Sequence, residues 1–193
     1  MSKNMPSSDQ LKKELDRAKK KKDKKGSKSF FASLVIAIIV VTAVVSVVTT
    51  RFFPIMKIEG NSMMPTLKNG NIAVAIRMNT LERGDICCFY SGSTVLCKRV
   101  IAVGGEIINI DANGVVYVDN RALNEPYVND IDFGNADIVF PYLVPEHAYF
   151  VMGDNREVSK DSRYSEIGCV FEGQVIGKLV FNIWPVDDIG SIE

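Results

Sequence analysis

Two residues, a serine and a lysine, have the surroundings that nucleophilic catalysis requires. Ser62 follows a Gly-Asn turn and stands three residues before Pro65, on a predicted bend that would expose its hydroxyl. Lys98 lies in a largely apolar run, residues 95–101, where burial would lower the pKa of its amine. A neutral lysine amine can take the proton of a serine hydroxyl. The local pattern around Lys98 by itself, however, fits a solvated or ion-paired strand residue better than a base.

A third segment, Gly153 to Arg163, is unusually rich in groups that can orient charge. It reads Gly-Asp-Asn-Arg-Glu-Val-Ser-Lys-Asp-Ser-Arg, with three carboxylates, two serines and two arginines in eleven residues. That density is too high for a core strand and unusual for a plain turn. The only histidine, His147, lies in a polar approach to a predicted strand, where a solvated loop side chain is the simpler interpretation. We therefore expect lysine, not histidine, to be the base.

The order of four short motifs is typical of one enzyme family. Ser62 to Thr66, Arg83 to Ile86, Lys98 to Ile101 and the segment 153–163 follow one another as the four sequence boxes of bacterial type I signal peptidases do. The resemblance covers about residues 30–184 and is to the short, single-anchor form typical of Gram-positive bacteria. It implies a membrane-anchored serine endopeptidase that removes signal peptides from exported preproteins, without a metal or cofactor.

The resemblance also implies a role for each matching residue. Ser62 would be the nucleophile, Lys98 the general base, and the Ser159 hydroxyl would hold the lysine amine. Two ion pairs would support them, Asp161 with Arg163 and Asp154 with Arg99. Pockets that accept only small side chains at the first and third positions before the cut are expected near Ile58, Met63, Leu67, Leu96 and Cys97. Gly60 stands where some members add a hydroxyl to the oxyanion hole, which leaves the second oxyanion donor open.

A membrane anchor must precede this site. Residues 29–50 form 22 uncharged positions between Lys28 and Arg51, enough for a helix of roughly 33 Å across a hydrocarbon core of about 30 Å. Residues 1–28 carry 11 basic and 4 acidic side chains, net +7, so the rest of the chain, with 12 and 19, has net −7. Because basic segments stay in the cytoplasm, we expect a cytoplasmic tail at 1–28, disordered or a frayed helix, a transmembrane anchor at 29–51 and an extracytoplasmic peptidase domain at 52–193.

Short runs rich in Val and Ile predict the strands that position the site. They are separated by turn residues and span 72–76, 86–90, 94–103, 106–110, 115–118, 148–152 and 174–181. A polar, proline-containing stretch, about 119–146, predicts a small irregular excursion. The predicted fold is therefore mostly β: one N-terminal transmembrane helix followed by an antiparallel β catalytic domain.

The four cysteines, Cys87, Cys88, Cys97 and Cys169, are compatible with one disulfide, but they are better explained as buried free thiols. Cys87 and Cys88 are neighbours on a predicted strand, so their side chains should point to opposite faces. A single histidine and the absence of a Cys-x-x-Cys motif argue against a zinc site.

Two other functions share part of the pattern. A membrane-tethered β module without activity would have the anchor and the strands but no use for both Ser62 and Lys98. A Ser-Lys protease that cleaves itself would have the dyad but no need of a positive-inside anchor. The balanced total charge argues against a nucleic-acid partner, so the expected partners are signal-bearing preproteins and the lipid bilayer. No feature of the sequence indicates an oligomeric state.

Overall fold

The computed structural model describes residues 8–78, 80–129 and 136–192. The chain divides into two compact units, Met1–Val48 and Thr49–Glu193. The first unit consists, in its described part, of helix. The second contains the strands and every candidate site residue.

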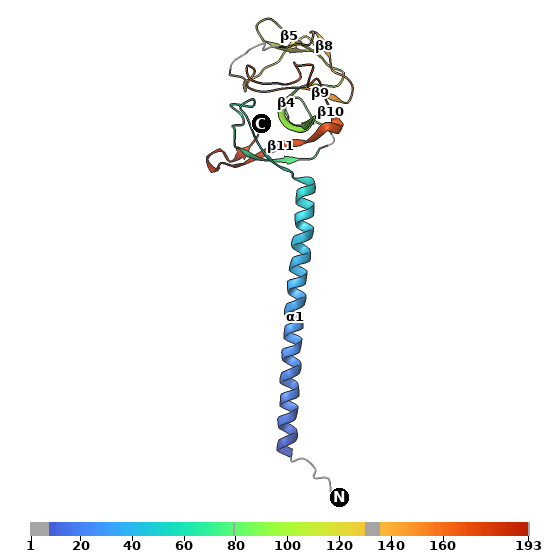
Figure 1. Cartoon of the computed structure of the whole chain (residues 1–193), viewed down its shortest axis with the longest axis vertical. Coiled ribbons are helices and arrows are strands. Elements are labelled where there is room, and N and C mark those ends of the chain that lie inside the picture. Colours follow the sequence, from blue (N-terminus) through green and yellow to red (C-terminus); the bar gives the residue numbers. More distant parts are fainter. Residues whose placement is uncertain (1–7, 79, 130–135, 193) are drawn as a thin grey trace. The chain divides into compact units, whose positions relative to one another are not determined.

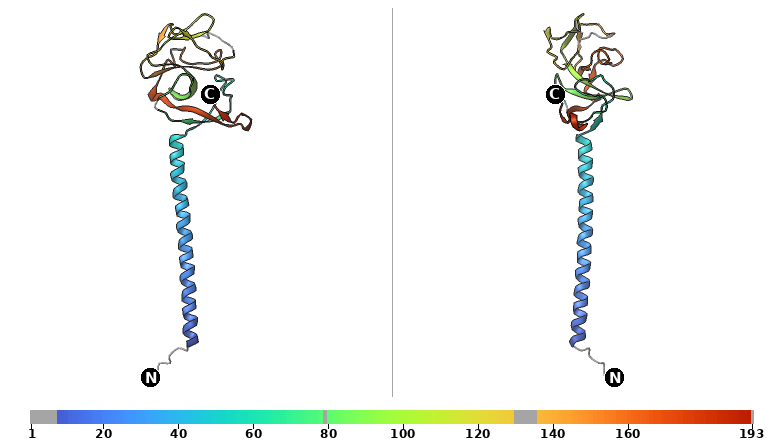
Figure 2. Two further views of the ribbon diagram at one scale, coloured as in Figure 1. Left: turned by 180° about the vertical axis from the view of Figure 1, so that it is seen from behind. Right: turned by 90° about the vertical axis from the view of Figure 1, so that its left-hand side faces the viewer.

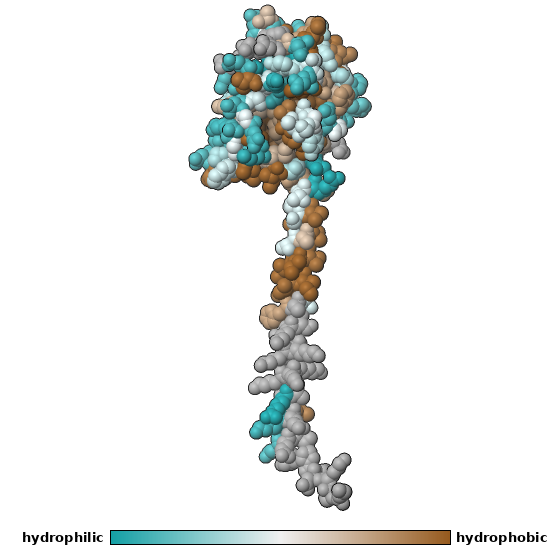
Figure 3. All heavy atoms as spheres, viewed as in Figure 1, coloured by the Kyte–Doolittle hydropathy of each residue, from teal (hydrophilic) through white to brown (hydrophobic). Residues whose placement is uncertain are grey.

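The helix α1 spans Ser8–Phe52 (Figure 1). It includes residues 8–28, for which we expected disorder or a frayed helix, while residues 1–7 lie outside the described part. Lys, Glu, Leu and Ala have high helix propensity, and this composition explains why residues 8–28 are helical and continuous with the apolar part of α1. Its part from Ser33 to Phe52 is long and apolar enough to cross a membrane, and Figure 3 shows hydrophobic side chains on its surface.

The second unit is built from antiparallel strands. Seven strands form a continuous path in the order β1-β2-β11-β3-β4-β9-β10, and β12 pairs with β11 on the side of that path. A smaller sheet has the order β7-β6-β5-β8. The strands are β1 Ile55–Lys57, β2 Ile72–Ile76, β3 Ile86–Ser91, β4 Thr94–Val103, β5 Ile107–Ile110, β6 Val116–Val118, β7 Arg121–Ala122, β8 Tyr142–Leu143, β9 Ala148–Met152, β10 Val170–Phe171, β11 Val175–Trp184 and β12 Gly190–Ser191. In Figures 1 and 2 the green β4 lies between the red β11 and the strands of the smaller sheet.

The mostly antiparallel β fold with one N-terminal apolar helix confirms the predicted fold class. Runs 72–76, 94–103 and 148–152 coincide with β2, β4 and β9, and the other predicted runs differ from the observed strands by one to three residues at an end. The expected excursion at 119–146 contains β7 and β8, which pair with β6 and β5. Its residues 130–135 lie outside the described part.

The large sheet is covered on both faces. Cys88 packs in one cluster with Ile58, Met63 and Leu67. Its neighbour Cys87 packs in a second cluster on the other face, as the alternation of a strand requires. A third cluster, which includes Ile108 and Phe150, joins the large sheet to the small one. The central strands are therefore buried on both sides and hold their side chains in fixed positions.

The expectation of free thiols is wrong for two of the four cysteines. Cys88 and Cys97 form a disulfide, whereas Cys87 and Cys169 are free. The reason is the register of the hairpin: β3 and β4 are joined by a two-residue turn, so Cys88 stands directly opposite Cys97. Side chains at such paired positions lie on the same face and close together.

Candidate active site

A tight turn after β1 presents Ser62. The turn is closed by the Gly70 N–H, which donates to the Ile58 carbonyl at 2.9 Å, and by the Gly60 N–H, which donates to Asn69 Oδ1 at 3.1 Å. Gly60 has φ of 89°, a left-handed conformation that favours glycine. The flanking Met63 is buried and anchors the turn in the core, while Ser62 itself stays partly accessible. The serine hydroxyl is thus held at the surface by a rigid loop.

The amine of Lys98 is directly beside this hydroxyl. Lys98 Nζ lies 2.6 Å from Ser62 Oγ, although the two residues are 36 positions apart in the chain. Lys98 sits in the middle of β4 and is only 3% exposed. Burial lowers the pKa of its amine from 10.5 to about 8, more than the opposing attraction of Asp161 and Asp154, and the Arg163 cation adds to the lowering. About a tenth of the amine is therefore neutral at pH 7, and about half at pH 8.

The segment 153–163 packs against the turn of the serine. The Asn155 N–H donates to the Ser62 carbonyl at 3.0 Å. A β-carbon at Gly153 would collide with that carbonyl oxygen and with Ser159 Oγ, so only glycine fits this approach. Ser159 Oγ is buried and has no hydrogen-bond partner among the described residues. The structure therefore brings Ser159 to the site without a hydrogen bond to Lys98.

The segment 153–163 is stabilised by a buried ion pair. Arg163 Nε donates to Asp161 Oδ1 at 2.8 Å, and both side chains are fully enclosed. Asp161 also accepts the Gly153 N–H at 3.0 Å. The carboxylate therefore connects the two ends of the segment and fixes the position of Gly153.

A second buried ion pair joins the segment to β4. Arg99 donates to both carboxylate oxygens of Asp154, each at 2.8 Å. Thr66 contributes a hydroxyl that donates to the same carboxylate, and Arg99 also donates to the Gly84 carbonyl at 2.8 Å. The serine turn, the lysine strand and the segment 153–163 thus meet at the Arg99 guanidinium.

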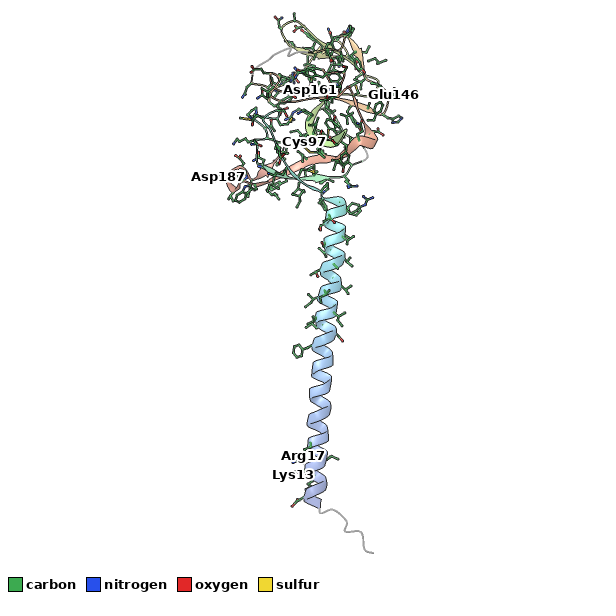
Figure 4. The ribbon with its side chains drawn as sticks, in the orientation of Figure 1. Lys13, Arg17, Cys97, Glu146, Asp161 and Asp187 are labelled. Carbon is green, nitrogen blue, oxygen red and sulfur yellow. A yellow bond between two sulfur atoms is a disulfide. The ribbon has the colours of Figure 1, made fainter. Side chains whose placement is uncertain are left out.

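A cavity of about 480 Å³ opens next to the serine and the lysine. Its walls come from two stretches of chain, Met56–Gly60 and Thr94–Lys98, together with Ser62 and Met63. Four of the five expected pocket residues, Ile58, Met63, Leu96 and Cys97, are among them. The fifth, Leu67, is not: it is 1% exposed and belongs to the core behind the turn. Figure 4 shows Cys97 inside the β unit, near its centre.

His147 takes no part in this arrangement. Its side chain is 80% exposed, and its Nδ1 lies 3.5 Å from Glu172 Oε1. In the described part of the chain, no group of three or more His, Cys, Asp or Glu side chains is placed to hold a metal ion.

Comparison with known proteins assigns this arrangement to a family. The family model described as signal peptidase, peptidase S26, matches residues 29–184, which include the apolar part of α1, Ser33–Phe52, and the site. The chain belongs to the signal peptidase family. The protein is therefore a peptidase, a signal peptidase I, as the order of the four motifs predicted.

Individual relatives agree with the family. Signal peptidase IB of Staphylococcus aureus is 34% identical over 151 residues, which cover 68% of this chain and 78% of the relative. Signal peptidase I of Bacillus caldolyticus is 33% identical over 157 residues, 72% of this chain and 85% of the relative. A crystal structure of a signal peptidase I from Enterococcus faecalis matches with 30% identity and a TM-score of 0.43, and covers 53% of this chain and 99% of that one.

Three residues that contact the charged groups of the site could not be assigned a role from the sequence. Thr66 lay inside a quoted motif but received no role. Glu125 and Tyr127 belong to the excursion, yet Glu125 pairs with the fully buried Arg156, and the Tyr127 ring stacks on Arg99. No spacing rule connects residue 125 or 127 with residues 99 and 156, so local patterns could not have found them.

Proposed function

We propose that Ser62 is the nucleophile and Lys98 the general base of a membrane-anchored endopeptidase that removes signal peptides from exported preproteins. The observation that carries the proposal is the 2.6 Å separation of Lys98 Nζ and Ser62 Oγ, with the amine buried and its pKa lowered to about 8. A lysine must be neutral to accept a proton, and burial supplies that condition. The exposed His147 cannot replace it from the surface.

The reaction follows from these two groups. Neutral Lys98 takes the Ser62 proton while Oγ attacks the carbonyl carbon of the scissile bond. The carbon–nitrogen bond then breaks, and the lysine ammonium gives its proton to the leaving amine. Water attacks the resulting ester, Lys98 accepts a proton from that water, and the proton returns to Ser62 as the acid is released.

Two further groups support the chemistry. The Ser62 N–H is the proposed oxyanion donor, a kind of group worth about 3 kcal/mol of transition-state stabilisation. The buried Ser159 hydroxyl, which lacks a partner in the described residues, is the group proposed to hold the Lys98 amine. It can accept from the ammonium when Lys98 is protonated, and it can donate to the neutral amine.

The cavity suggests how a preprotein is read. The strand β1 forms one end of the strand path, and the part of β4 before Arg99 pairs with β3 alone among the described strands. Both stretches line the cavity and so offer free backbone groups to an extended substrate. Because alternate side chains of an extended peptide point the same way, the first and third residues before the cut would face the same wall. The side chains of Met63 and Leu96 line the cavity and take up space at that wall, which favours substrates with small residues at these two positions.

The charge distribution supports a defined orientation in the membrane. The +7 segment before the apolar helix would remain cytoplasmic, and the −7 remainder would lie outside the cell membrane. Preproteins are delivered to the same face with their own apolar segment in the bilayer, so anchoring raises the effective concentration of enzyme and cleavage site. Protease added to spheroplasts should digest residues after about 51 and spare residues 1–28. A protected β unit would contradict this orientation.

The decisive experiment mixes detergent-solubilised protein with a signal-bearing precursor and sequences the new amino terminus. Ser62→Ala, Lys98→Ala and Lys98→Arg should each lose at least a hundredfold in rate, since a general base contributes 10² to 10⁴ and a guanidinium cannot accept the proton. A precursor with phenylalanine instead of alanine before the cut should resist cleavage. If the protein cleaves itself but not the precursor, the result favours a self-processing protease. If neither the precursor nor the protein is cleaved, the result favours a tethered binding module.

A further inference from the structure

Two residues of the excursion reach the charged groups that hold the catalytic segments together. The Tyr127 ring lies under the Arg99 guanidinium, with its centroid 4.0 Å from the central carbon. Glu125 accepts two hydrogen bonds from Arg156, at 3.1 and 2.5 Å. The Tyr127 hydroxyl donates to Glu125 Oε1 at 2.9 Å, so the two residues form one unit. We call this unit, Glu125 with Tyr127, the excursion clamp.

The first contact of the clamp covers the meeting point of three segments. Arg99 follows the base Lys98 along β4, and its guanidinium donates to Asp154 and to Thr66. Thr66 lies four residues after Ser62 in the chain. An aromatic face attracts a cation and leaves its in-plane N–H groups free to donate elsewhere. Tyr127 therefore restricts Arg99 to the plane in which it bonds to both neighbours.

The second contact holds the segment that packs on Ser62. Arg156 Nε donates to the Gly153 carbonyl at 3.1 Å, and the Arg156 carbonyl accepts from Arg163 at 2.8 Å. The Arg156 side chain is completely buried, and only Glu125 among the described residues pairs its charge. A buried arginine that loses its carboxylate partner strongly destabilises the folded protein, so its side chain would move toward solvent. Its displacement would move Gly153, whose close approach to the Ser62 carbonyl leaves no spare room.

We propose that Glu125 and Tyr127 are positioning residues for the peptidase reaction, holding Arg99 and Arg156 so that Ser62 and Lys98 stay in reactive geometry. The proposal rests on the proposed Ser-Lys mechanism. Neither residue lines the cavity next to Ser62. Loss of the clamp should therefore lower kcat and leave KM nearly unchanged, which distinguishes it from a substrate contact. A residue that only stabilised the fold would reduce the folded fraction without changing kcat per folded molecule.

The test compares Tyr127→Leu with Tyr127→Phe in the full-length, detergent-solubilised protein, using kcat, KM and the unfolding temperature. Tyr127→Leu should lose at least tenfold in kcat per folded molecule with KM within twofold. Tyr127→Phe keeps the ring over Arg99 and should stay within threefold of the parent. Tyr117→Leu is the matched control, because Tyr117 lies on β6 of the small sheet and pairs there with Ala122 and Asn109. It should cleave at the parent rate.

Three outcomes would overturn the clamp: folded Tyr127→Leu with parent kcat, equal losses in Tyr127→Leu and Tyr127→Phe, or an equal loss in Tyr117→Leu. If Tyr127→Leu does not fold at the assay temperature, Glu125→Gln decides, since it keeps an acceptor for Arg156 but removes the charge. A tenfold loss of kcat supports the clamp there and an unchanged kcat refutes it. The Ser-Lys mechanism is tested separately, by comparing precursor cleavage by the parent with cleavage by Ser62→Ala. A failure of that mechanism can therefore be distinguished from a failure of the clamp.

Discussion

Raising the pH from 7 to 9 should increase kcat/KM about tenfold and then bring it to a plateau. With the pKa of Lys98 lowered to about 8, the neutral fraction of its amine is about 9% at pH 7 and about 91% at pH 9. A lysine at the unperturbed pKa would be neutral to only about 0.03% at pH 7 and about 3% at pH 9, so its rate would still be climbing. The position of the plateau therefore reports the burial of this one amine.

The assay measures initial rates of cleavage of a precursor in detergent, between pH 6 and 10.5, at substrate concentrations below KM. In that range kcat/KM reports the pKa of the free enzyme's base. The precursor should carry no group near the cut that titrates in the same range, and the folded fraction is measured at each pH. Lys160→Met is the matched control, because Lys160 is an exposed lysine of the segment 153–163.

Three results would contradict this prediction. A rate that keeps rising tenfold per pH unit through pH 9.5 would mean that Lys98 is not desolvated in the working enzyme. A rate that is independent of pH above 7 would mean that a group of lower pKa, or none, acts as the base. An altered profile in Lys160→Met would show that surface charge, not the buried amine, controls the midpoint.

Three other predictions follow from single residues. Lys98→Met should raise the free energy of unfolding by about 3 kcal/mol at pH 7, because the folded parent must hold a buried cation there. This gain in stability should shrink between pH 8 and 10.5, because the unfolded parent still binds the Lys98 proton in that range and the folded parent has lost it. An unchanged unfolding temperature at pH 7 would contradict the prediction. His147→Ala should cleave within about twofold of the parent rate, since a general base would cost 10² or more. Gly153→Ala should lower the free energy of unfolding by about 1–3 kcal/mol through overcrowding and should cleave at least tenfold more slowly. A parent-like rate would show that the close packing of Gly153 on the Ser62 carbonyl does not restrict the reaction.

The sequence predicted the parts of the site that stand in contiguous motifs. Ser62 and Lys98 could be identified because each lies in a short segment whose residue types and order are specific to the family. Seven of the twelve described strands were also predictable to within three residues at each end, since β-rich runs alternate with Gly and Asn turns, whereas β1, β7, β8, β10 and β12 are too short to give such a pattern. The uncharged run 29–50 predicted a membrane anchor, and the change from net +7 before it to net −7 after it predicted an orientation, without reference to any fold.

Contacts between distant segments were not predictable in the same way. The partnership of Glu125 with Arg156 depends on where an irregular excursion settles, and no periodicity encodes that position. Leu67 was misplaced for a related reason: a buried apolar residue beside the nucleophile looks the same in a pocket wall and in a core. The pairing of Cys88 with Cys97 was more predictable, because a two-residue turn at 92–93 determines which residues of β3 and β4 stand opposite each other.

The disulfide includes Cys97, the residue before Lys98 on β4, and it bears on the compartment in which the β unit folds. The bond can form only where thiols are oxidised, whereas the cytoplasm keeps cysteines reduced. A molecule whose β unit remained on the cytoplasmic side would carry two additional thiols and a mass two hydrogens higher. If the β unit is exported, as proposed, the Cys88–Cys97 bond distinguishes exported molecules from retained ones, and alkylation with a thiol reagent before reduction would separate the two.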